Sequence, residues 1–201
     1  VSLSNVVRWL AEQAEELEVM MFPGFAADEI LYNDDGSVRG VLTGDMGVAA
    51  NGEAKPSFEP GYELLGKYTI FAEGCRGHLG KRLISRFALD KDSDPQHYGI
   101  GLKELWEVSP EKHEQGVVMH GSGWPLTDTG SSGGWWLYFD ENNQVSFGMV
   151  IDLSYSNPYM SPFDEMQRLK LHPVIRNVLE GGKRLSYGAR ALTKGGLISV
   201  S

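Results

Sequence analysis

Residues 133–153 have the sequence GGWWLYFDENNQVSFGMVIDL, in which a polar stretch separates two apolar runs rich in aromatic and β-branched residues. Trp135–Phe139 and Val145–Leu153 have the length and the near-alternating pattern of half-buried strands. Upstream, His97–Val108 and Gly116–His120 have the same character. These four segments, with glycine-rich turns between them, predict an antiparallel sheet.

Two short helices are predicted after these strands. Ser161-Pro162-Phe163-Asp164 has the pattern of a capping box with proline at the first helical position, and His172-Pro173 ends that helix. A second helix spans Pro173–Glu180 and stops at Gly181-Gly182. Residues 183–201 have the pattern of a further strand pair.

The first 90 residues have a different pattern. Apolar residues recur every three or four positions over Leu3–Leu17, which predicts an amphipathic helix. Asp35-Gly36 between two apolar stretches is a hairpin signal, and residues 44–61 are either a polar loop or a second hairpin. The strands predicted here are residues 19–22, 25–32 and 38–42.

A strand, a small-residue turn and a helix follow one another at residues 67–87. The strand Lys67–Ala72 leads into Glu73-Gly74-Cys75-Arg76-Gly77, and a helical pattern begins near Leu79. A helix N-terminus with unpaired amides attracts phosphate, so one interpretation is a cofactor contact with Arg76 as an added cation. The other is an ordinary turn whose glycines meet a conformational need. No complete G-x-G-x-x-G fingerprint is present.

Composition excludes several classes of function. The chain has 201 residues, 25 of them glycine, and a formal net charge of −9, which argues against a nucleic-acid partner. Cys75 is the only cysteine, so no internal disulfide and no two-cysteine zinc or iron–sulfur site can be built from this chain alone. The histidines are scattered without metal-ligand spacing, and no metal site is expected.

No apolar run reaches the roughly 18 residues of a membrane-spanning helix, and no leader pattern is present. Because Val1 already lies inside a helical pattern, the chain is expected to be a piece of a longer protein. The aromatic, proline-broken stretch Tyr155–Phe163 either touches a membrane interface or packs on its own domain.

The diglycine Gly133-Gly134 lies between large apolar side chains, with Trp124-Pro125 on one side and Trp135-Trp136 on the other. Bare backbone beside aromatic rings suits a flat, apolar ligand whose oxygens bond to main-chain groups. A hairpin loop with a stacked aromatic core is the alternative.

Several segments closely resemble the electron transfer flavoprotein–ubiquinone oxidoreductase family, and the resemblance spans essentially the whole chain in order. They are IFAEGCRGHL (70–79), YGIGLKELW (98–106), GWPL (123–126), NPYMSPF (157–163), LEGGKR (179–184) and YGARAL (187–192).

The resemblance implies an enzyme that carries FAD and a 4Fe–4S cluster and passes electrons from reduced electron transfer flavoprotein to ubiquinone. It also implies peripheral attachment to the mitochondrial inner membrane or a bacterial plasma membrane. The dinucleotide fingerprint would lie upstream of this chain and the cluster cysteines downstream, so the segment alone is expected to be inactive. The rival is a flavin-dependent aromatic hydroxylase or reductase that takes a soluble substrate in the same pocket.

By the same resemblance, Gly74, Cys75, Arg76 and Gly77 would contact FAD. Gly133 and Gly134 would meet a ubiquinone carbonyl through their backbone, beside Trp124 and Pro125. No side chain of this chain is expected to act as acid, base or nucleophile, because the flavin and the cluster carry the chemistry.

The expected fold class is α+β. An antiparallel sheet with short helices forms a ubiquinone-binding domain over residues 91–182, inserted in part of a glutathione-reductase-like FAD domain. Residues 1–90 would belong to the FAD-binding domain, and residues 183–201 would return to it.

Overall fold

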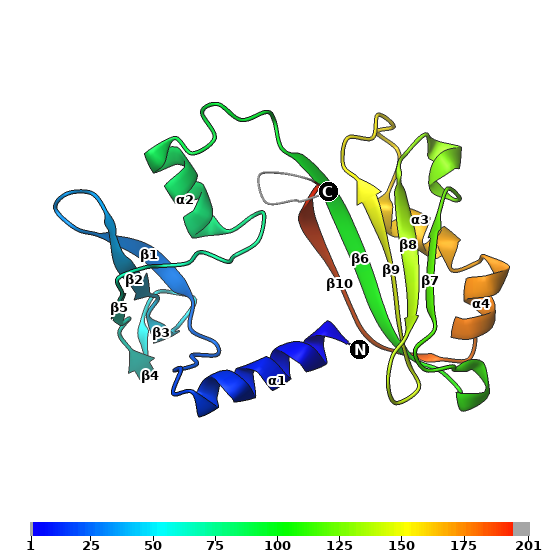
Figure 1. The fold of residues 1–201 in the computed structure, drawn as a ribbon, viewed down its shortest axis with the longest axis horizontal. Coiled ribbons are helices and arrows are strands. Elements are labelled where there is room, and N and C mark those ends of the chain that lie inside the picture. The colour runs from blue at the N-terminus through cyan, green and yellow to red at the C-terminus, as the bar shows by residue number, and fades with distance from the viewer. Residues whose placement is uncertain (1, 195–201) are drawn as a thin grey trace. The chain divides into compact units, whose positions relative to one another are not determined.

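The structure, a computed structural model, describes residues 2–194 of the chain (Figure 1). It contains helices and antiparallel sheets, as the α+β prediction requires. Two compact units are present. One is Gln13–Asp94, and the other combines residues 2–12 with residues 95–194.

The second unit is built on a five-stranded antiparallel sheet in the order β10-β6-β9-β8-β7. This confirms the antiparallel sheet predicted from residues 97–153. Its strands are β6 (His97–Glu107), β7 (Val118–Ser122), β8 (Gly133–Phe139), β9 (Gln144–Asp152) and β10 (Lys183–Lys194).

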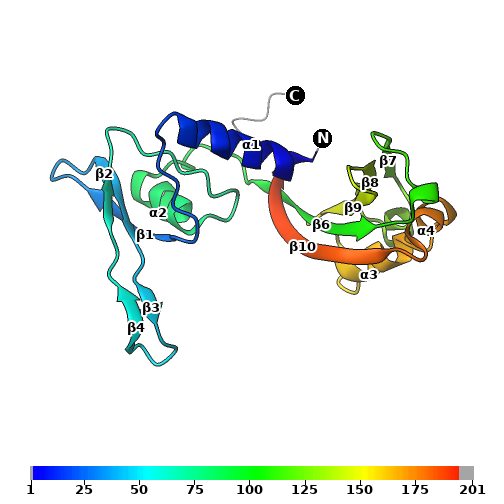
Figure 2. The same cartoon turned by 90° about the horizontal axis from the view of Figure 1, so that it is seen from below.

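Helices α3 (Pro162–Leu169) and α4 (Pro173–Leu179) lie on one face of this sheet (Figures 1 and 2). The hydroxyl of Ser161 accepts a hydrogen bond from the Asp164 amide at 3.3 Å, so the predicted cap is present. Alternate residues of β8 and β9 are buried with the helices in one core. Its fully buried members include Leu137, Val145, Phe147, Met149, Ile151 and Ile175. Short 3₁₀ turns occur at Pro110–Lys112 and Leu126–Thr129.

The other unit contains small sheets and one helix, α2 (His78–Phe87). The Asp35-Gly36 hairpin is confirmed, and residues 44–61 form a second hairpin rather than a loop. The strands are β1 (Ala27–Tyr32), β2 (Val38–Thr43), β3 (Met46–Val48), β4 (Ala54–Glu59) and β5 (Glu63–Leu65). Helix α1 (Leu3–Glu16) matches the predicted amphipathic helix and crosses the division between the units.

Two predicted strands differ from the structure. Residues 19–22 are not a strand, and residues 67–72, which begin with a bend, pair with no strand among the described residues. Tyr68 and Ile70 of the latter segment are about nine-tenths exposed, at 92% and 90%. A strand needs a hydrogen-bonded neighbour as well as a suitable sequence, and within the described residues this segment has none.

Residues 183–194 form one long strand that pairs with β6 along its full length. A pair of strands was predicted there, and the predicted second half, residues 195–201, lies outside the described residues. The assignment of residues 183–201 to an FAD-binding domain stays a prediction. What the structure adds is that residues 183–194 complete the edge of the same sheet.

Glu104 of β6 is a buried charged group of this unit, with a relative exposure of 4%. Its Oε1 accepts from Lys170 Nζ at 2.8 Å and Arg184 Nη1 at 3.2 Å, and its Oε2 accepts from Trp106 Nε1 at 2.8 Å. Burial alone raises the pKa of the Glu104 carboxyl, but the bonds from Lys170, Trp106 and Arg184 outweigh burial and hold that pKa below its ordinary value. The cluster links β6 and β10 to Lys170, the residue that follows α3.

Replacing Glu104 by alanine is expected to lower the free energy of unfolding of the chain by about 3–5 kcal/mol, because it leaves the buried end of Lys170 without its partner. Urea unfolding measures the loss. Glu180→Ala, which breaks an exposed pair with Arg176 at 2.9 Å, should leave stability nearly unchanged. Equal losses in the two variants would contradict a special role for Glu104.

Acid unfolding tests the same carboxylate. Since the pKa of Glu104 is lower in the folded chain than its ordinary value of 4.5, its contribution is complete above about pH 4.5 and is lost as the pH falls through the folded pKa. In Glu104→Gln, the free energy of unfolding should therefore fall less steeply below pH 4.5, by at most about 1.4 kcal/mol per pH unit. Parallel curves for the two proteins would show that Glu104 is not responsible.

Candidate functional site

The diglycine Gly133-Gly134 forms the first two residues of strand β8 and does not lie in a hairpin loop. Gly133 is paired in register with Ile151, and Gly134 is paired with Val150 on one side and Ser122 on the other. The connection from β7 to β8 contains the cis peptide between Trp124 and Pro125. Both predicted pairs of residues therefore lie at one end of β8.

The hydrogen-bond ladder decides which way each glycine's main chain points. In an antiparallel sheet, residues bond alternately to the strand on one side and to the strand on the other. Ser132 O accepts from Asp152 N at 3.0 Å, and Phe139 N donates to Val117 O at 3.0 Å. This alternation directs the amide and carbonyl of Gly134 toward β9, and those of Gly133 toward the β7 side.

Strand β7 ends at Ser122, opposite Gly134, so the main-chain groups of Gly133 point past its end. There the chain turns away, and the Gly123 carbonyl accepts from Thr127 N at 3.2 Å. Gly133 is exposed, whereas the rest of β8 is at least half-buried. Of the two glycines, Gly133 is therefore the one whose main chain is directed past the end of β7 rather than toward β9.

Close packing within the protein requires both glycines in any case. A Cβ on Gly133 would lie 2.1 Å from Val150 O and 2.7 Å from Leu126 Cδ1, and one on Gly134 would lie 2.8 Å from Gly121 O. Real Cβ atoms do not approach other atoms so closely. The presence of two glycines is consequently not, by itself, a sign of a ligand.

Pro125 is fully buried, while the Trp124 side chain is 38% exposed. The Trp124 ring centroid lies 6.0 Å from that of His172, and the Arg168 guanidinium lies 5.7 Å from the Trp124 ring. His172 was not predicted as a site residue. Its Nδ1 is buried and has no hydrogen-bond partner in the described part of the chain. No sequence spacing could have found this contact, because it forms only when the α3–α4 junction folds back on the β7–β8 connection.

Trp135 and Trp136 point to opposite faces of the sheet, and each lies over a glycine. Trp135 packs on the buried core, where a Cβ on Gly121 would lie 2.2 Å from its ring. Trp136 lies on the other face, where a Cβ on Gly148 would also lie 2.2 Å from its ring. The two rings are therefore held by the sheet itself and do not jointly cover the diglycine.

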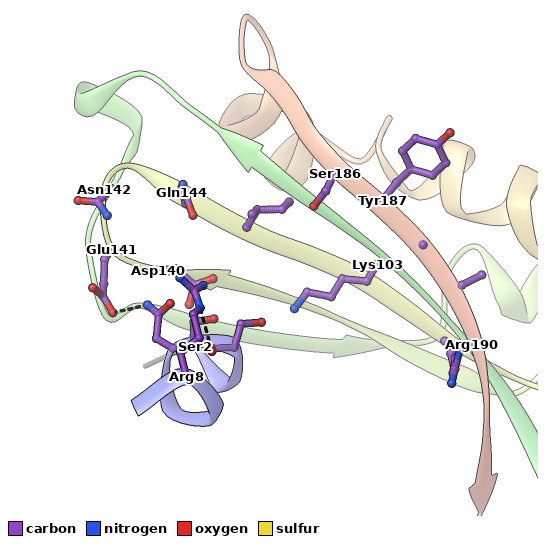
Figure 3. A pocket seen from close by; sticks show the side chains of 16 residues that line it. Ser2, Arg8, Lys103, Asp140, Glu141, Asn142, Gln144, Ser186, Tyr187 and Arg190 are labelled. Carbon is purple, nitrogen blue, oxygen red and sulfur yellow. Dashed lines mark hydrogen bonds between the residues drawn. The ribbon is translucent and has the colours of Figure 1, made fainter. Parts of the chain in front are cut away.

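Two cavities in this unit are lined by other residues. A cavity of about 590 Å³ lies on the sheet face opposite α3, and Arg8, Lys103 and Arg190 bring positive charge to it (Figure 3). Asp140 and Glu141 lie at the same cavity, and Glu141 accepts a hydrogen bond from Asn5 at 3.1 Å. A second cavity of about 430 Å³ lies beside Met166 and Glu104. None of the predicted site residues lines either cavity.

The Gly74–Gly77 turn leads into α2, as predicted, but the first amides of that helix already have an acceptor. Glu73 Oε2 accepts from Gly80 N at 2.7 Å and Glu73 Oε1 from Leu79 N at 3.3 Å. A phosphate group would need these same donors, so a cofactor diphosphate does not fit the helix N-terminus as it stands. Arg76 is exposed, Cys75 is half-buried, and contact of the four turn residues with FAD stays a prediction.

An iron–sulfur cluster does not fit the residues of this chain. A 4Fe–4S cluster is held by four cysteine thiolates, and Cys75 is the chain's only cysteine. Among residues 2–194, no group of three or more histidine, cysteine or acidic side chains could hold a metal ion. The described helices also include none that is long and apolar enough to cross a membrane.

A family model and several known proteins that are similar to this chain carry the same family name. Residues 98–192, from β6 to β10, match the family described as "ETF-QO, ubiquinone-binding". Over its whole length the chain is 70% identical to a probable electron transfer flavoprotein-ubiquinone oxidoreductase of Acinetobacter baylyi and 58% identical to the enzyme of that name from Pseudomonas aeruginosa. It is 52% identical to the mitochondrial protein of the same name from Homo sapiens.

The chain spans about a third of the length of these relatives, 35%, 36% and 33% respectively. Among solved structures, it is similar to a triple mutant of the flavin-dependent brominase Bmp2, with a TM-score of 0.57 over 95% of this chain and 44% of that one. At 13% identity, this likeness concerns the fold alone. Over its whole length the chain is therefore similar to electron transfer flavoprotein–ubiquinone oxidoreductases, and residues 98–192 match the ubiquinone-binding family model.

Proposed function

We propose that this chain supplies the ubiquinone site and part of the FAD site of an oxidoreductase. The whole enzyme passes electrons from reduced electron transfer flavoprotein, through FAD and a 4Fe–4S cluster, to ubiquinone. The observation that carries the proposal is the match of the β6–β10 region to a ubiquinone-binding family, together with the names of relatives that are 52–70% identical. This segment alone is expected to have no activity.

In this proposal the quinone head lies beside Gly133, past the end of β7. The Gly133 amide, which the ladder directs to that side, donates to a quinone carbonyl oxygen. The half-exposed Trp124 ring covers part of the quinone, while Pro125 and Leu126 form an apolar wall behind it. Gly134, which bonds toward β9, holds the start of β8 in place rather than touching the quinone.

FAD, when bound, supplies the electron transfer between donor and acceptor. In this chain, the exposed guanidinium of Arg76 is the group suited to one of its phosphates, and Gly74 gives the turn its shape with φ of +77°. The chain has no ligands for the cluster, which other parts of the protein would hold. A flavin-dependent hydroxylase or reductase is not favoured, because the relatives are named as ubiquinone oxidoreductases.

Ubiquinone is a membrane lipid, so the proposal includes a peripheral contact with a mitochondrial inner membrane or a bacterial plasma membrane. The Tyr155–Phe163 stretch supplies the candidate residues. Tyr159 is 93% exposed and Phe163, at the start of α3, is 58% exposed. Aromatic side chains of this kind favour the headgroup region of a bilayer.

The quinone site is tested in the full-length protein with Gly133→Ala. The new Cβ must push the start of β8 away from Val150 O and so move the Gly133 amide. We expect reduction of a short-chain ubiquinone to fall by about tenfold or more, the effect of losing one well-placed hydrogen bond, while electron uptake from electron transfer flavoprotein is unchanged. Steady-state assays of the two half-reactions measure both.

Gly148→Ala is the matched control, since its Cβ would lie 2.2 Å from the Trp136 ring and 2.6 Å from Leu102 O in the same sheet, away from the diglycine. It should keep quinone reduction near the wild-type rate. Equal losses in both variants would show that sheet distortion is the cause, and full activity of Gly133→Ala would remove Gly133 from the site.

Membrane contact is tested by sedimenting the chain with phosphatidylcholine vesicles. Replacing Tyr159 and Phe163 together by serine should lower the apparent affinity about tenfold or more, because two aromatic side chains no longer enter the interface. Tyr187→Ser, which removes a ring with an exposed fraction of 76%, between those of Phe163 and Tyr159, from edge strand β10, should bind like the wild type. If all three proteins bind alike or none binds, the stretch is not the contact.

A further inference from the structure

The carboxylate of Glu73 lies directly over the N-terminus of α2. An α-helix begins with four amides that have no carbonyl partner inside the helix. For α2 these belong to Gly77, His78, Leu79 and Gly80. Gly77 N donates to Gly74 O at 3.3 Å, and Leu79 N and Gly80 N donate to the two oxygens of Glu73 at 3.3 and 2.7 Å. Three of the four amides thus have an acceptor from the preceding turn.

The turn is shaped around this carboxylate. A Cβ on Gly77 would lie 2.4 Å from Glu73 Cβ and 2.7 Å from its Oε2, so the missing side chain at residue 77 makes the room that Glu73 occupies. Gly80, at the third helical position, leaves 3.5 Å between a built Cβ and the same Oε2. The glycine spacing that resembles a phosphate-binding turn is accounted for by an anion belonging to the chain.

His78 connects this cap to the neighbouring sheet. Its Nδ1 lies 3.3 Å from Glu73 Oε1, and its Nε2 lies 2.8 Å from the carbonyl oxygen of Ala27 in β1. Arg82, one turn further along α2, donates to Asp28 O at 3.0 Å. Glu73 therefore helps to fix the start of a helix that is anchored on β1 at two points.

We propose that Glu73 is a positioning residue whose carboxylate permanently occupies the anion-binding N-terminus of α2, so that this terminus does not take the cofactor's phosphate. The capping role of Glu73 does not depend on the proposed function. Only the binding of a flavin phosphate by Arg76 rests on it. A flavin phosphate that meets this turn is bound through Arg76. The carboxylate holds the turn in the shape that presents Arg76.

The capping part is tested on the chain itself with Glu73→Ala and inorganic pyrophosphate as the probe. Loss of the cap should lower the melting temperature of the Gln13–Asp94 unit by about 4–8 °C. Pyrophosphate should raise the melting temperature of Glu73→Ala and shift its Leu79 and Gly80 amide resonances, because those donors are now open. The wild-type chain should show neither effect. Glu73→Gln, which keeps one acceptor oxygen, should recover part of the stability and bind pyrophosphate more weakly than the alanine variant.

Pyrophosphate shifts at Leu79 and Gly80 in the wild type would overturn the inference, since they would show that an external anion displaces Glu73. So would a Glu73→Ala chain that is as stable as the wild type or that ignores pyrophosphate. If Glu73→Ala does not fold, the same comparison is made between Glu73→Gln and the wild type, and absence of any pyrophosphate effect in Glu73→Gln then counts against the inference.

The flavin part is tested by FAD content of the purified full-length protein. Arg76→Gln should lose FAD through its lost charge without a change in melting temperature of the apoprotein, whereas Glu73→Gln should lower that melting temperature. Full FAD content in Arg76→Gln would overturn the assignment to Arg76. A wild-type full-length protein that holds no FAD would contradict the proposed function instead, and would leave the amide shifts of the capping test as they are.

Discussion

The sheet unit depends on the burial of one face of β8 and β9 against α3 and α4. Leu137, Phe147, Met149 and Ile151 are fully buried there, and each such side chain contributes about 1.5–3 kcal/mol relative to exposure. Because side chains alternate along a strand, a shift of one residue in the pairing of β8 with β9 would turn this set to the opposite face. The register observed, with Leu137 opposite Phe147, is the one that buries both.

That register also determines where the candidate ligand site can be. Once Leu137 is opposite Phe147, the alternation of the ladder directs the Gly133 main chain away from β9 and that of Gly134 toward it. The orientation of one amide at the end of β8 is thus a consequence of apolar packing further along the same strand. The shortness of β7, which stops at Ser122, then leaves that amide facing the β7–β8 connection.

Local sequence patterns predicted many of the helices, strands and turns, but not which strands that are distant in sequence pair with each other. The Asp35-Gly36 hairpin, the Ser161 cap and the strands around residues 133–153 depend on turn chemistry, capping and alternation, which are written in consecutive residues. The pairing of β10 with β6 joins residues that are 76 positions apart at Lys183–Glu107 and 97 apart at Lys194–His97, and no local pattern specifies it. Residues 67–72 show the converse case, in which a strand-like sequence has no partner among the described residues.

The assignment of Gly133, Gly134, Trp124 and Pro125 to a ubiquinone site stays a prediction, but the structure shows how their local geometry differs from what the sequence suggested. Gly133 and Gly134 begin β8, and Trp124 and Pro125 lie in the connection that leads into it, whereas the sequence left a hairpin loop open for the diglycine and gave both glycines the same role. The contact of Trp124 with His172 and the cap made by Glu73 required side-chain positions, which composition and spacing do not contain.

Packing within the chain accounts for glycine in both clusters, at Gly77 of the Gly74–Gly77 turn and at Gly133-Gly134. Glycine at these positions is therefore not evidence for a bound ligand. At Gly77 the absent side chain makes room for Glu73, and at Gly133 it makes room for Val150 O and Leu126. A glycine that allows close approach of protein atoms is no evidence for a ligand at the same place. What does point outward is the Arg76 side chain at one turn and the Gly133 main chain at the other. The two clusters therefore differ in the chemistry they offer: a fixed positive charge suits a phosphate, and a neutral amide beside an aromatic ring suits a carbonyl oxygen.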